Sequence, residues 1–256
     1  MKKTFFFTCL FCALFGFSQQ KPPLFIGHRG GLLPNIPENS LMAFQNCIDE
    51  EVAMIETDVQ LSKDGKMVLF HDASLLRMTG VSKKLKNCTL KELQKLSLGA
   101  EQQIPTLEAA LSLLASDKIQ LLLDIKAGPE LDYSELYKLL ERYHMKSRVY
   151  IGVRSLKDLQ ICKSLDAKVK VLGFVPGPES IENFVTNHAD AIRLWPNWLE
   201  EHPTLISNLV NKNIPIWMTV GALSTTGIKA WVQQGVHGFI HDTPKKAATE
   251  YTMSFK

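Results

Sequence analysis

The chain has 256 residues, a length that fits one large domain or two small ones. Its 29 Lys and Arg nearly balance its 26 Asp and Glu, which excludes a broad basic surface for nucleic acid. Beyond residue 18 three of the five cysteines remain, Cys47, Cys88 and Cys162, and they form no CxxC motif and no His/Cys cluster, so the sequence indicates neither a disulfide framework nor a zinc site.

The first 18 residues have the pattern of a secretory signal peptide. Lys2 and Lys3 precede an apolar run at 5–17, and the small residues Gly16 and Ser18 stand at the −3 and −1 positions of a cleavage site. An uncleaved membrane anchor is the alternative, but the run is too short to span a bilayer comfortably. We therefore expect an exported protein, periplasmic or secreted, with no stable membrane insertion after the signal is removed.

The remainder, 19–256, alternates short apolar strands with amphipathic helices and contains no linker. Strands are expected at 24–27, 54–59 with 67–70, 119–125, 149–153, 168–174, 190–194, 214–219 and 237–241. Helices are expected at 40–50, 106–116, 133–144, 155–165, 179–187, 198–212 and 224–234.

This alternation predicts an α/β fold with parallel strands. Eight units in one domain fit a (β/α)8 TIM barrel, which typically takes ~250 residues, with a short insertion at 72–104 after the second strand. A doubly wound open sheet is the alternative. It would normally carry a glycine-rich phosphate loop after its first strand, where this chain has His-Arg-Gly-Gly at 28–31.

Several charged residues fall at the ends of the expected strands. His28 ends the first strand, Glu56 and Asp58 share one face of the second, and Asp124 and Lys126 share one face of the third. C-terminal strand ends form the catalytic face of such barrels. Two carboxylates that point the same way repel each other unless a cation lies between them.

These residue types suit the hydrolysis of a phosphate ester. Three carboxylates, Glu56, Asp58 and Asp124, supply hard oxygen ligands for one divalent metal ion, Mg²⁺ or Ca²⁺. The guanidinium of Arg29 suits phosphate oxygens, and Lys126 offers a point charge. Histidine side chains ordinarily titrate near neutral pH and can exchange protons with the entering and leaving oxygens. The candidates for these transfers are His28 and His71.

The order of short motifs resembles that of the glycerophosphodiester phosphodiesterase family. These motifs are Gly27-His28-Arg29-Gly30, Pro37-Glu38-Asn39-Ser40, Glu56-Thr57-Asp58, Lys63-Asp64-Gly65 and His71-Asp72. The resemblance implies cleavage of deacylated phospholipids to glycerol 3-phosphate and an alcohol. It makes the two histidines the acid/base pair and the Glu-x-Asp pair, with a later acid, the metal ligands. In that family a free glycerol hydroxyl is thought to attack first, giving a cyclic phosphate, and the insertion partly covers the site.

The chain also departs from the family pattern. The third motif, usually Glu-x-Lys, is Asp124-Ile125-Lys126, so its acid is one methylene shorter. Near the seventh strand a WTVN pattern becomes WMTVG at 217–221, and near the eighth His237 and His241 replace an Asp and a Thr. We expect Arg193 and Trp217 to join Arg29 and Lys126 in contacting the substrate, a small-molecule glycerophosphodiester. Trp195 shares a face with Arg193 and could contact a head group, or the two could be a packing pair at the barrel rim.

Three alternatives stay open. A lysophospholipase D-type enzyme would accept acylated lipids, with access decided by the insertion. A glycosidase also uses a carboxylate pair on a barrel, but it would not need Arg29 and Lys126 beside two histidines. A non-catalytic binding protein on the same barrel would have no need for both histidines and all three acids.

Overall fold

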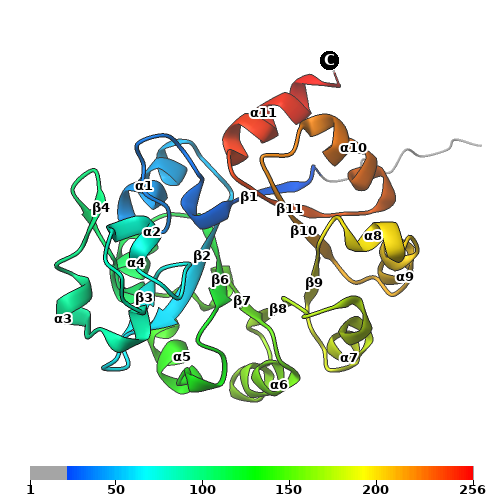
Figure 1. Ribbon diagram of the computed structural model, residues 1–256. Helices are drawn as coiled ribbons and strands as arrows, with labels where there is room; N and C mark the ends of the chain where they lie inside the picture. Colours follow the sequence, from blue (N-terminus) through cyan, green and yellow to red (C-terminus); the bar gives the residue numbers. More distant parts are fainter. Residues whose placement is uncertain (1–21, 256) are drawn as a thin grey trace, which may run out of the picture.

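The centre of the molecule is a closed barrel of eight parallel strands. A computed structural model describes residues 22–255, so the predicted signal peptide lies outside the described residues. The strands pair in the order β1-β11-β10-β9-β8-β7-β6-β2, and pairing of β1 with β2 closes the ring (Figure 1). The strands are β1 (Leu24–Gly27), β2 (Met54–Leu61), β6 (Gln120–Ile125), β7 (Val149–Val153), β8 (Lys170–Gly173), β9 (Ala191–Leu194), β10 (Ile216–Gly221) and β11 (Gly238–His241). The predicted barrel is confirmed.

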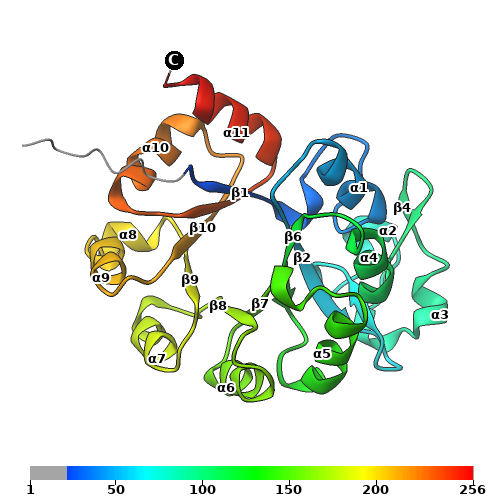
Figure 2. The same cartoon turned by 180° about the vertical axis from the view of Figure 1, so that it is seen from behind.

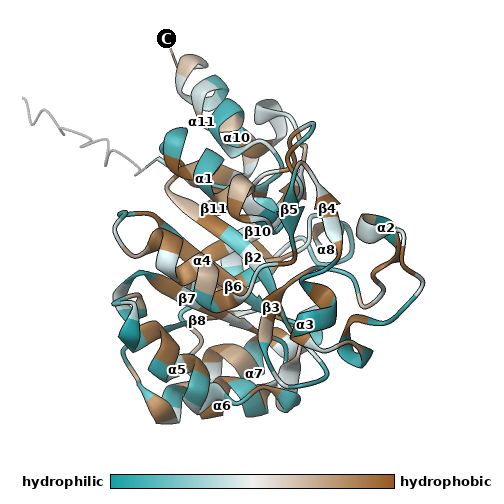
Figure 3. Cartoon of the chain, turned by 90° about the vertical axis from the view of Figure 1, so that its left-hand side faces the viewer, coloured by the Kyte–Doolittle hydropathy of each residue, from teal (hydrophilic) through white to brown (hydrophobic). Residues whose placement is uncertain are grey.

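Helices surround the barrel on all sides, as both axial views show (Figure 1, Figure 2). They are α1 (Leu41–Asp49), α4 (Leu107–Leu114), α5 (Tyr133–Arg142), α6 (Leu156–Leu165), α7 (Ile181–Thr186), α8 (Trp198–Glu201), α9 (Leu205–Asn211), α10 (Thr225–Gln234) and α11 (Pro244–Met253). Short 3-10 turns lie at η1 (His28–Gly30), η3 (Gly128–Glu130), η4 (Lys146–Arg148) and η5 (Pro178–Ser180). Side-chain oxygens of Ser40, Thr106, Asp132 and Ser155 cap α1, α4, α5 and α6. Helix α5 carries both apolar and polar residues (Figure 3), and its Leu136 and Leu140 are buried.

Two helices differ from the sequence prediction, and proline explains both. The helix expected over 198–212 is divided into α8 and α9 around Pro203. The residue before a proline is driven out of the helical region, and His202 has φ −128° and ψ 66°. Helix α11 was not predicted. It begins at Pro244, a position where the missing N–H costs nothing because the first turn has no intrahelical acceptor for it.

The insertion after the second strand is an ordered unit. It follows a hairpin of β2 with the antiparallel strand β3 (Met67–Leu69). It contains α2 (Leu76–Thr79), η2 (Leu85–Asn87), α3 (Leu90–Leu93), β4 (Ser97–Gly99) and β5 (Gln102–Gln103). Its apolar residues form a separate cluster, made of Val68, Phe70, Leu75, Leu85, Cys88, Leu93, Leu98 and Ile104. The insertion lies outside the helix ring, near α4 (Figure 1, Figure 2), with a small core of its own.

Two layers of apolar side chains stabilise the barrel. Outward-facing strand residues such as Ile55 and Val59 pack against the helices. Inward-facing residues fill the barrel interior, and they are Ile26, Met54, Leu122, Leu172, Phe174, Ala191, Trp217 and Ile240. Full burial of one such side chain contributes about 1.5–3 kcal/mol. Inward positions alternate along β2, so Met54 belongs to this floor and Glu56 and Asp58 lie above it.

The three cysteines within residues 22–255 are free and buried, in agreement with the predicted lack of a disulfide framework. Cys47 is a core thiol, and burial raises its pKa to about 12. In the described part of the chain, no helix combines the length and the apolar character needed to cross a membrane.

Candidate active site

The C-terminal ends of the barrel strands enclose a cavity of about 420 Å³. Eight of the nine expected site residues line it, namely His28, Arg29, Glu56, Asp58, His71, Asp124, Lys126 and Arg193. The other lining residues are Arg154, Phe174, Trp195, Thr219, Val220, Gly221 and Ile240. Side chains that are far apart in the sequence therefore meet at one end of the barrel.

Trp217 is the expected site residue that does not line this cavity. On β10, Trp217 and Thr219 face the same side because they are two residues apart. Thr219 lines the cavity, whereas Trp217 lies one layer deeper. Its side chain is 4% exposed, and its ring centroid is 4.7 Å from that of Tyr150. Trp217 therefore fills the barrel floor beneath the cavity.

Glu56, Asp58 and Asp124 form a buried acidic triad whose ligand oxygens lie within 4.8 Å of one another. Asp58 and Asp124 are register partners on the adjacent strands β2 and β6. Burial and the neighbouring carboxylates raise the pKa of Glu56 well above its usual range. Three crowded, buried hard oxygens with this electrostatic tension fit a divalent cation such as Mg²⁺ or Ca²⁺.

Two cations hold the carboxylate of Asp124, one from the end of its own strand β6 and one from the end of the adjacent strand β7. Lys126 Nζ lies 2.7 Å from Asp124 Oδ2 and 3.1 Å from Asp58 Oδ1. Arg154 follows β7 and binds both oxygens of Asp124, with Nη2 2.7 Å from Oδ2 and Nη1 on Oδ1. Burial alone would raise the pKa of Asp124, but the hydrogen bonds from Arg154 and the charge of Lys126 bring it below its usual value. Asp124 is therefore ionised and firmly oriented.

The turn after β1 places Arg29 against the triad. Arg29 has a left-handed backbone (φ 53°), and its main-chain N–H donates to Glu56 Oε2 at 2.8 Å. Its Nη1 donates to Glu38 at 2.9 Å, and its Nε is buried without a hydrogen-bond partner. Gly30 also has positive φ, and a Cβ there would stand 2.8 Å from the Cβ of Ala43. The glycine after Arg29 is therefore required by both conformation and space.

The Pro-Glu-Asn-Ser motif supports the same site residues. Glu38 accepts the hydrogen bond from Arg29, and Ser40 caps α1. Asn39 is buried, and its Nδ2 donates to Asp58 Oδ2 at 2.9 Å. Its Oδ1 accepts from the hydroxyl of Thr57 at 2.6 Å, which fixes the amide orientation. Glu38 and Asn39 therefore hold residues at the triad, and Ser40 fixes the start of the helix that follows.

His28 has a carboxylate partner from the other end of the chain. Its Nδ1 lies 2.7 Å from Asp242 Oδ1, and Asp242 follows β11, the neighbour of β1. The hydrogen bond from His28 lowers the pKa of Asp242. A carboxylate can only accept, so Nδ1 carries the proton and Nε2 is left as the atom that can take up another.

His71 has the same arrangement, built from the insertion. Its Nδ1 lies 2.7 Å from Asp72 Oδ1, and Arg77 Nε donates to Asp72 Oδ2 at 2.5 Å. The hydrogen bond from Arg77 lowers the pKa of Asp72 to about 2. Arg77 also donates to both oxygens of Glu38, at 2.6 and 3.1 Å. A continuous network therefore joins His71 to Arg29 through Arg77 of α2.

The two histidines near the last strand do not line the cavity. His241 Nε2 lies 2.9 Å from the carbonyl oxygen of Leu223, and its Nδ1 accepts from the N–H of Thr243 at 3.0 Å. His237 precedes β11 at the opposite end of the barrel, where its Nδ1 accepts from Ile216 N at 3.3 Å. Both are satisfied by backbone groups, which gives them structural roles.

Two site residues escaped the sequence reasoning, Arg154 and Asp242. Each directly follows a barrel strand, so its position at a C-terminal strand end was a usable signal. Their partners could not be read from the sequence, because Arg154 reaches Asp124 across strands and Asp242 reaches His28 across the closure of the barrel.

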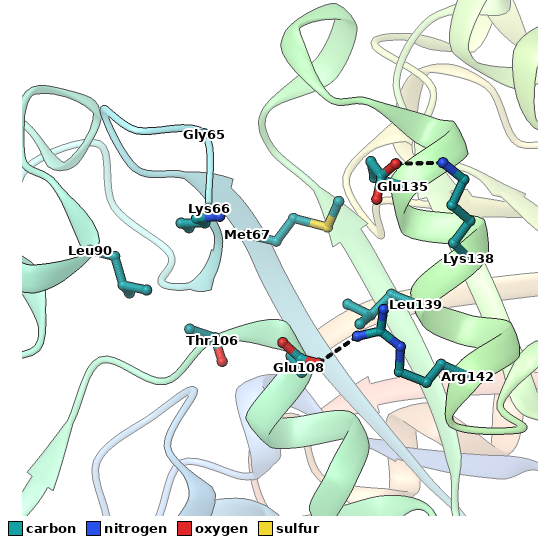
Figure 4. Close-up of a pocket in the computed structure, with 10 residues that line it drawn as sticks. All are labelled: Gly65, Lys66, Met67, Leu90, Thr106, Glu108, Glu135, Lys138, Leu139 and Arg142. Atoms are coloured by element: carbon teal, nitrogen blue, oxygen red, sulfur yellow. Dashed lines mark hydrogen bonds and ion pairs between the residues drawn. The ribbon is translucent and has the colours of Figure 1, made fainter.

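A second hollow, of about 370 Å³, lies outside the barrel against α4 and α5 (Figure 4). Its charged side chains pair with each other. Glu135 lies 2.6 Å from Lys138 and Glu108 lies 2.9 Å from Arg142, as the dashed lines show. No histidine lines it. We therefore assign the chemistry to the barrel cavity.

Comparison with known proteins supports this assignment. The model of the glycerophosphoryl diester phosphodiesterase family matches residues 28–193. A glycerophosphodiester phosphodiesterase of Caldanaerobacter subterraneus subsp. tengcongensis is 28% identical over 235 residues, covering 87% of this chain and 95% of the relative. A glycerophosphoryl diester phosphodiesterase structure from Parabacteroides distasonis has a TM-score of 0.77 at 26% identity, covering 93% and 89%. A phosphodiesterase from Oleispira antarctica, solved with its product sn-glycerol-3-phosphate, has a TM-score of 0.78 at 21% identity, covering 89% and 97%.

Fold and site together define a barrel hydrolase for phosphate esters. The cavity combines an acidic triad of the kind that binds a metal with Arg and Lys side chains that suit phosphate oxygens. The family match covers well over half of the chain. The chain belongs to the glycerophosphoryl diester phosphodiesterase family, which consists of divalent-metal-dependent phosphoric diester hydrolases.

Proposed function

We propose that this protein hydrolyses glycerophosphodiesters, the deacylated forms of phospholipids, to glycerol 3-phosphate and an alcohol. The observation that carries the proposal is the pair His28 and His71. Each has a carboxylate on Nδ1, and both line one cavity with the acidic triad. The substrate class named for the Caldanaerobacter relative supports the same reaction.

The triad is the group that would hold one metal ion, Mg²⁺ or Ca²⁺. Glu56, Asp58 and Asp124 supply only oxygen donors, which suits either ion. A bound divalent cation would supply Lewis-acid stabilisation of charge on a phosphoryl oxygen. Asn39 and Lys126 hold Asp58, and the Arg29 N–H holds Glu56, so the chain itself fixes the donor positions.

The histidines account for the two proton transfers. One imidazole Nε2 accepts the proton of the attacking glycerol hydroxyl as its oxygen bonds to phosphorus. The other, protonated, gives a proton to the alcohol oxygen as its bond to phosphorus breaks, which leaves a cyclic phosphate. Water then opens the cyclic phosphate to glycerol 3-phosphate, with the two histidines in exchanged roles. Asp242 and Asp72 keep Nδ1 protonated in each ring and stabilise the imidazolium form. Arg29 and Lys126 line the same cavity and would supply positive charge to the phosphate oxygens.

The cavity lining favours this reaction over the alternatives. Its apolar side chains are Phe174, Trp195, Val220 and Ile240, whereas nine charged or histidine side chains line the same cavity, which suits a polar substrate better than an acyl chain. A glycosidase would leave its two carboxylates free to act on the sugar, whereas Asp58 and Asp124 are tied to cations. A binding protein would not need two histidines oriented by carboxylates.

The test is a substrate panel with the purified protein, assayed with Mg²⁺, with Ca²⁺ and after dialysis against EDTA. Glycerophosphoethanolamine and glycerophosphocholine should release glycerol 3-phosphate, and EDTA should abolish the release. Lysophosphatidylcholine tests the acylated alternative. Full turnover in EDTA would refute the metal proposal. Faster cleavage of the acylated lipid would shift the assignment to a lysophospholipase D.

A further inference from the structure

Arg193 is a buried cation that lacks a partner. It lies on β9, lines the active-site cavity and is 5% exposed. Its Nε and Nη1 have no hydrogen-bond partner among residues 22–255, and no carboxylate in this range forms an ion pair with it. Burial lowers its pKa to about 10, which still leaves it charged at neutral pH. Burying a charge without a partner costs free energy of desolvation, and a ligand of opposite charge would offset this cost.

Aromatic rings hold this guanidinium in place. Its carbon lies 4.1 Å from the ring centroid of Trp195, 5.1 Å from that of Phe174 and 5.8 Å from that of Trp198. Arg154 lies 5.2 Å from the same Phe174 ring. Two cations therefore lie against the ring of Phe174. The rings around Arg193 offer no hydrogen-bond acceptor, so its buried Nε and Nη1 stay without one among residues 22–255.

The charges of the cavity point to a second negative group. Its lining holds three carboxylates and four fixed cations, Arg29, Lys126, Arg154 and Arg193. The first three cations lie within 4 Å of triad carboxylates, and Arg193 does not. Arg29 also pairs with Glu38, so Arg193 is the cavity cation for which the described residues supply no carboxylate. An anionic group on the substrate would give Arg193 that partner.

We propose that Arg193, with Phe174 and Trp195, forms a subsite for an anionic group on the alcohol side of the substrate. This inference rests on the proposed phosphodiesterase function and narrows its substrate class. The group is a carboxylate, as in glycerophosphoserine, or a second phosphodiester, as in bis(glycerophospho)glycerol. The N–H groups on Nε and Nη1 that lack a partner can each donate to an oxygen of either group.

Glycerophosphoserine and glycerophosphoethanolamine make a matched test, because they differ only by one carboxylate. Wild-type enzyme should cleave the serine compound with the higher kcat/KM. Arg193→Gln should lower the serine-to-ethanolamine ratio by roughly 10- to 100-fold, the scale of a lost charge-assisted hydrogen bond. The loss should lie mainly in KM, and Arg193→Lys should recover part of it. Bis(glycerophospho)glycerol is assayed in the same way. A loss of kcat/KM in Arg193→Gln similar to that for glycerophosphoserine would show that a second phosphodiester occupies the subsite as a carboxylate does.

Arg142→Gln is the matched control. Arg142 is 64% exposed and pairs with Glu108 in the hollow outside the barrel (Figure 4), so its replacement should leave the ratio unchanged. Equal losses on both substrates in Arg193→Gln would make Arg193 a ligand of the scissile phosphate and overturn the proposal. The proposal would also be overturned if the wild-type kcat/KM for glycerophosphoserine were equal to or lower than that for glycerophosphoethanolamine. Cleavage of neither compound with either metal would refute the proposed function itself.

Binding to the wild-type protein gives a readout that needs neither turnover nor a variant. Calorimetry in Mg²⁺ or Ca²⁺ should show tighter binding of O-phosphoserine than of O-phosphoethanolamine. Equal binding of the two compounds contradicts the subsite, even if Arg193→Gln fails to fold.

Discussion

At the scale of single residues, the site is built from carboxylates that act on other side chains. Asp242 and Asp72 each orient one histidine, and Glu38 receives hydrogen bonds from Arg29 and Arg77. These acids lie beside the triad and are occupied by their partners. Because these three acids are bound to histidine and arginine partners, Glu56, Asp58 and Asp124 are the carboxylates suited to a metal ion.

Replacing either histidine should reduce the chemical step. His28→Ala or His71→Ala should lower kcat by ~10²-fold or more, the usual scale for loss of an acid or base. The double variant should lose far less than the product of the two effects, because the groups act as a unit. Steady-state kinetics of the three variants, with circular dichroism as the control for folding, makes the measurement. Near wild-type kcat in a single variant would refute the role of that residue.

Asp124→Glu tests the acid at which this chain departs from the family motif. If Asp124 is a direct ligand, the added methylene must move the ion or displace a water. Mg²⁺ tolerates that less well than Ca²⁺, because it requires octahedral geometry at ~2.1 Å. We expect the ratio of Mg²⁺- to Ca²⁺-supported kcat/KM to change more than Tm does.

The structure supplies a competing role for Asp124, as an anchor for Lys126 and Arg154. In that case Asp124→Glu should affect both metals equally. Calorimetric titration with each ion separates the two roles without relying on turnover. Unchanged affinities for both ions would remove Asp124 from the ligands.

At the scale of elements, the insertion supplies part of the active site. Helix α2 carries Arg77, which links Asp72 to Glu38 and so connects the insertion to the loops after β3 and β1. The small apolar cluster of the insertion holds this helix in place. The insertion therefore positions His71 besides flanking the barrel.

Arg77→Met should loosen His71 and destabilise the protein at every pH at which Asp72 is ionised, with the effect disappearing in strong acid. We expect kcat to fall less than in His71→Ala, because the imidazole remains. The pKa of Asp72 should rise from about 2 toward its ordinary 3.8. Stability from a lowered carboxyl pKa is fully present above the unfolded pKa and is lost as pH falls through the folded one. The difference in unfolding free energy between wild type and variant should therefore shrink from pH 4 to pH 2.

The measurement is denaturant unfolding at several pH values across this window. Arg142→Met is the control, since it removes another surface-paired arginine far from His71. A constant difference between wild type and Arg77→Met over that range would contradict the role assigned to the Asp72 pair.

Much of this arrangement follows from the sequence, and the rest depends on distant contacts. Alternation along β2 placed Glu56 and Asp58 inward, and the strand ends placed His28 and Asp124 on the catalytic face. The same alternation could not tell that Trp217 lies one layer too deep, since depth depends on the stagger of neighbouring strands. The clamp of Arg154 on Asp124 depends on side-chain reach across β6 and β7, which no local pattern encodes.

At the scale of the whole molecule, we propose that the barrel is exported and works without its first 18 residues. The basis is the pattern of basic, apolar and small residues before Gln19. Intact-mass analysis after expression of the full chain in a bacterium should give a chain beginning at Gln19 in the exported fraction. A full-length product that stays with the membrane would instead indicate the uncleaved anchor.

The contact between His28 and Asp242 joins positions 214 residues apart. His28 is synthesised 214 residues before Asp242, so this carboxylate cannot hold the imidazole in its working tautomer until β11 has been made and has paired with β1. A chain that stops short of β11 lacks both this barrel strand and Asp242, the acid that orients His28. We therefore expect such a truncation to abolish activity rather than to reduce it.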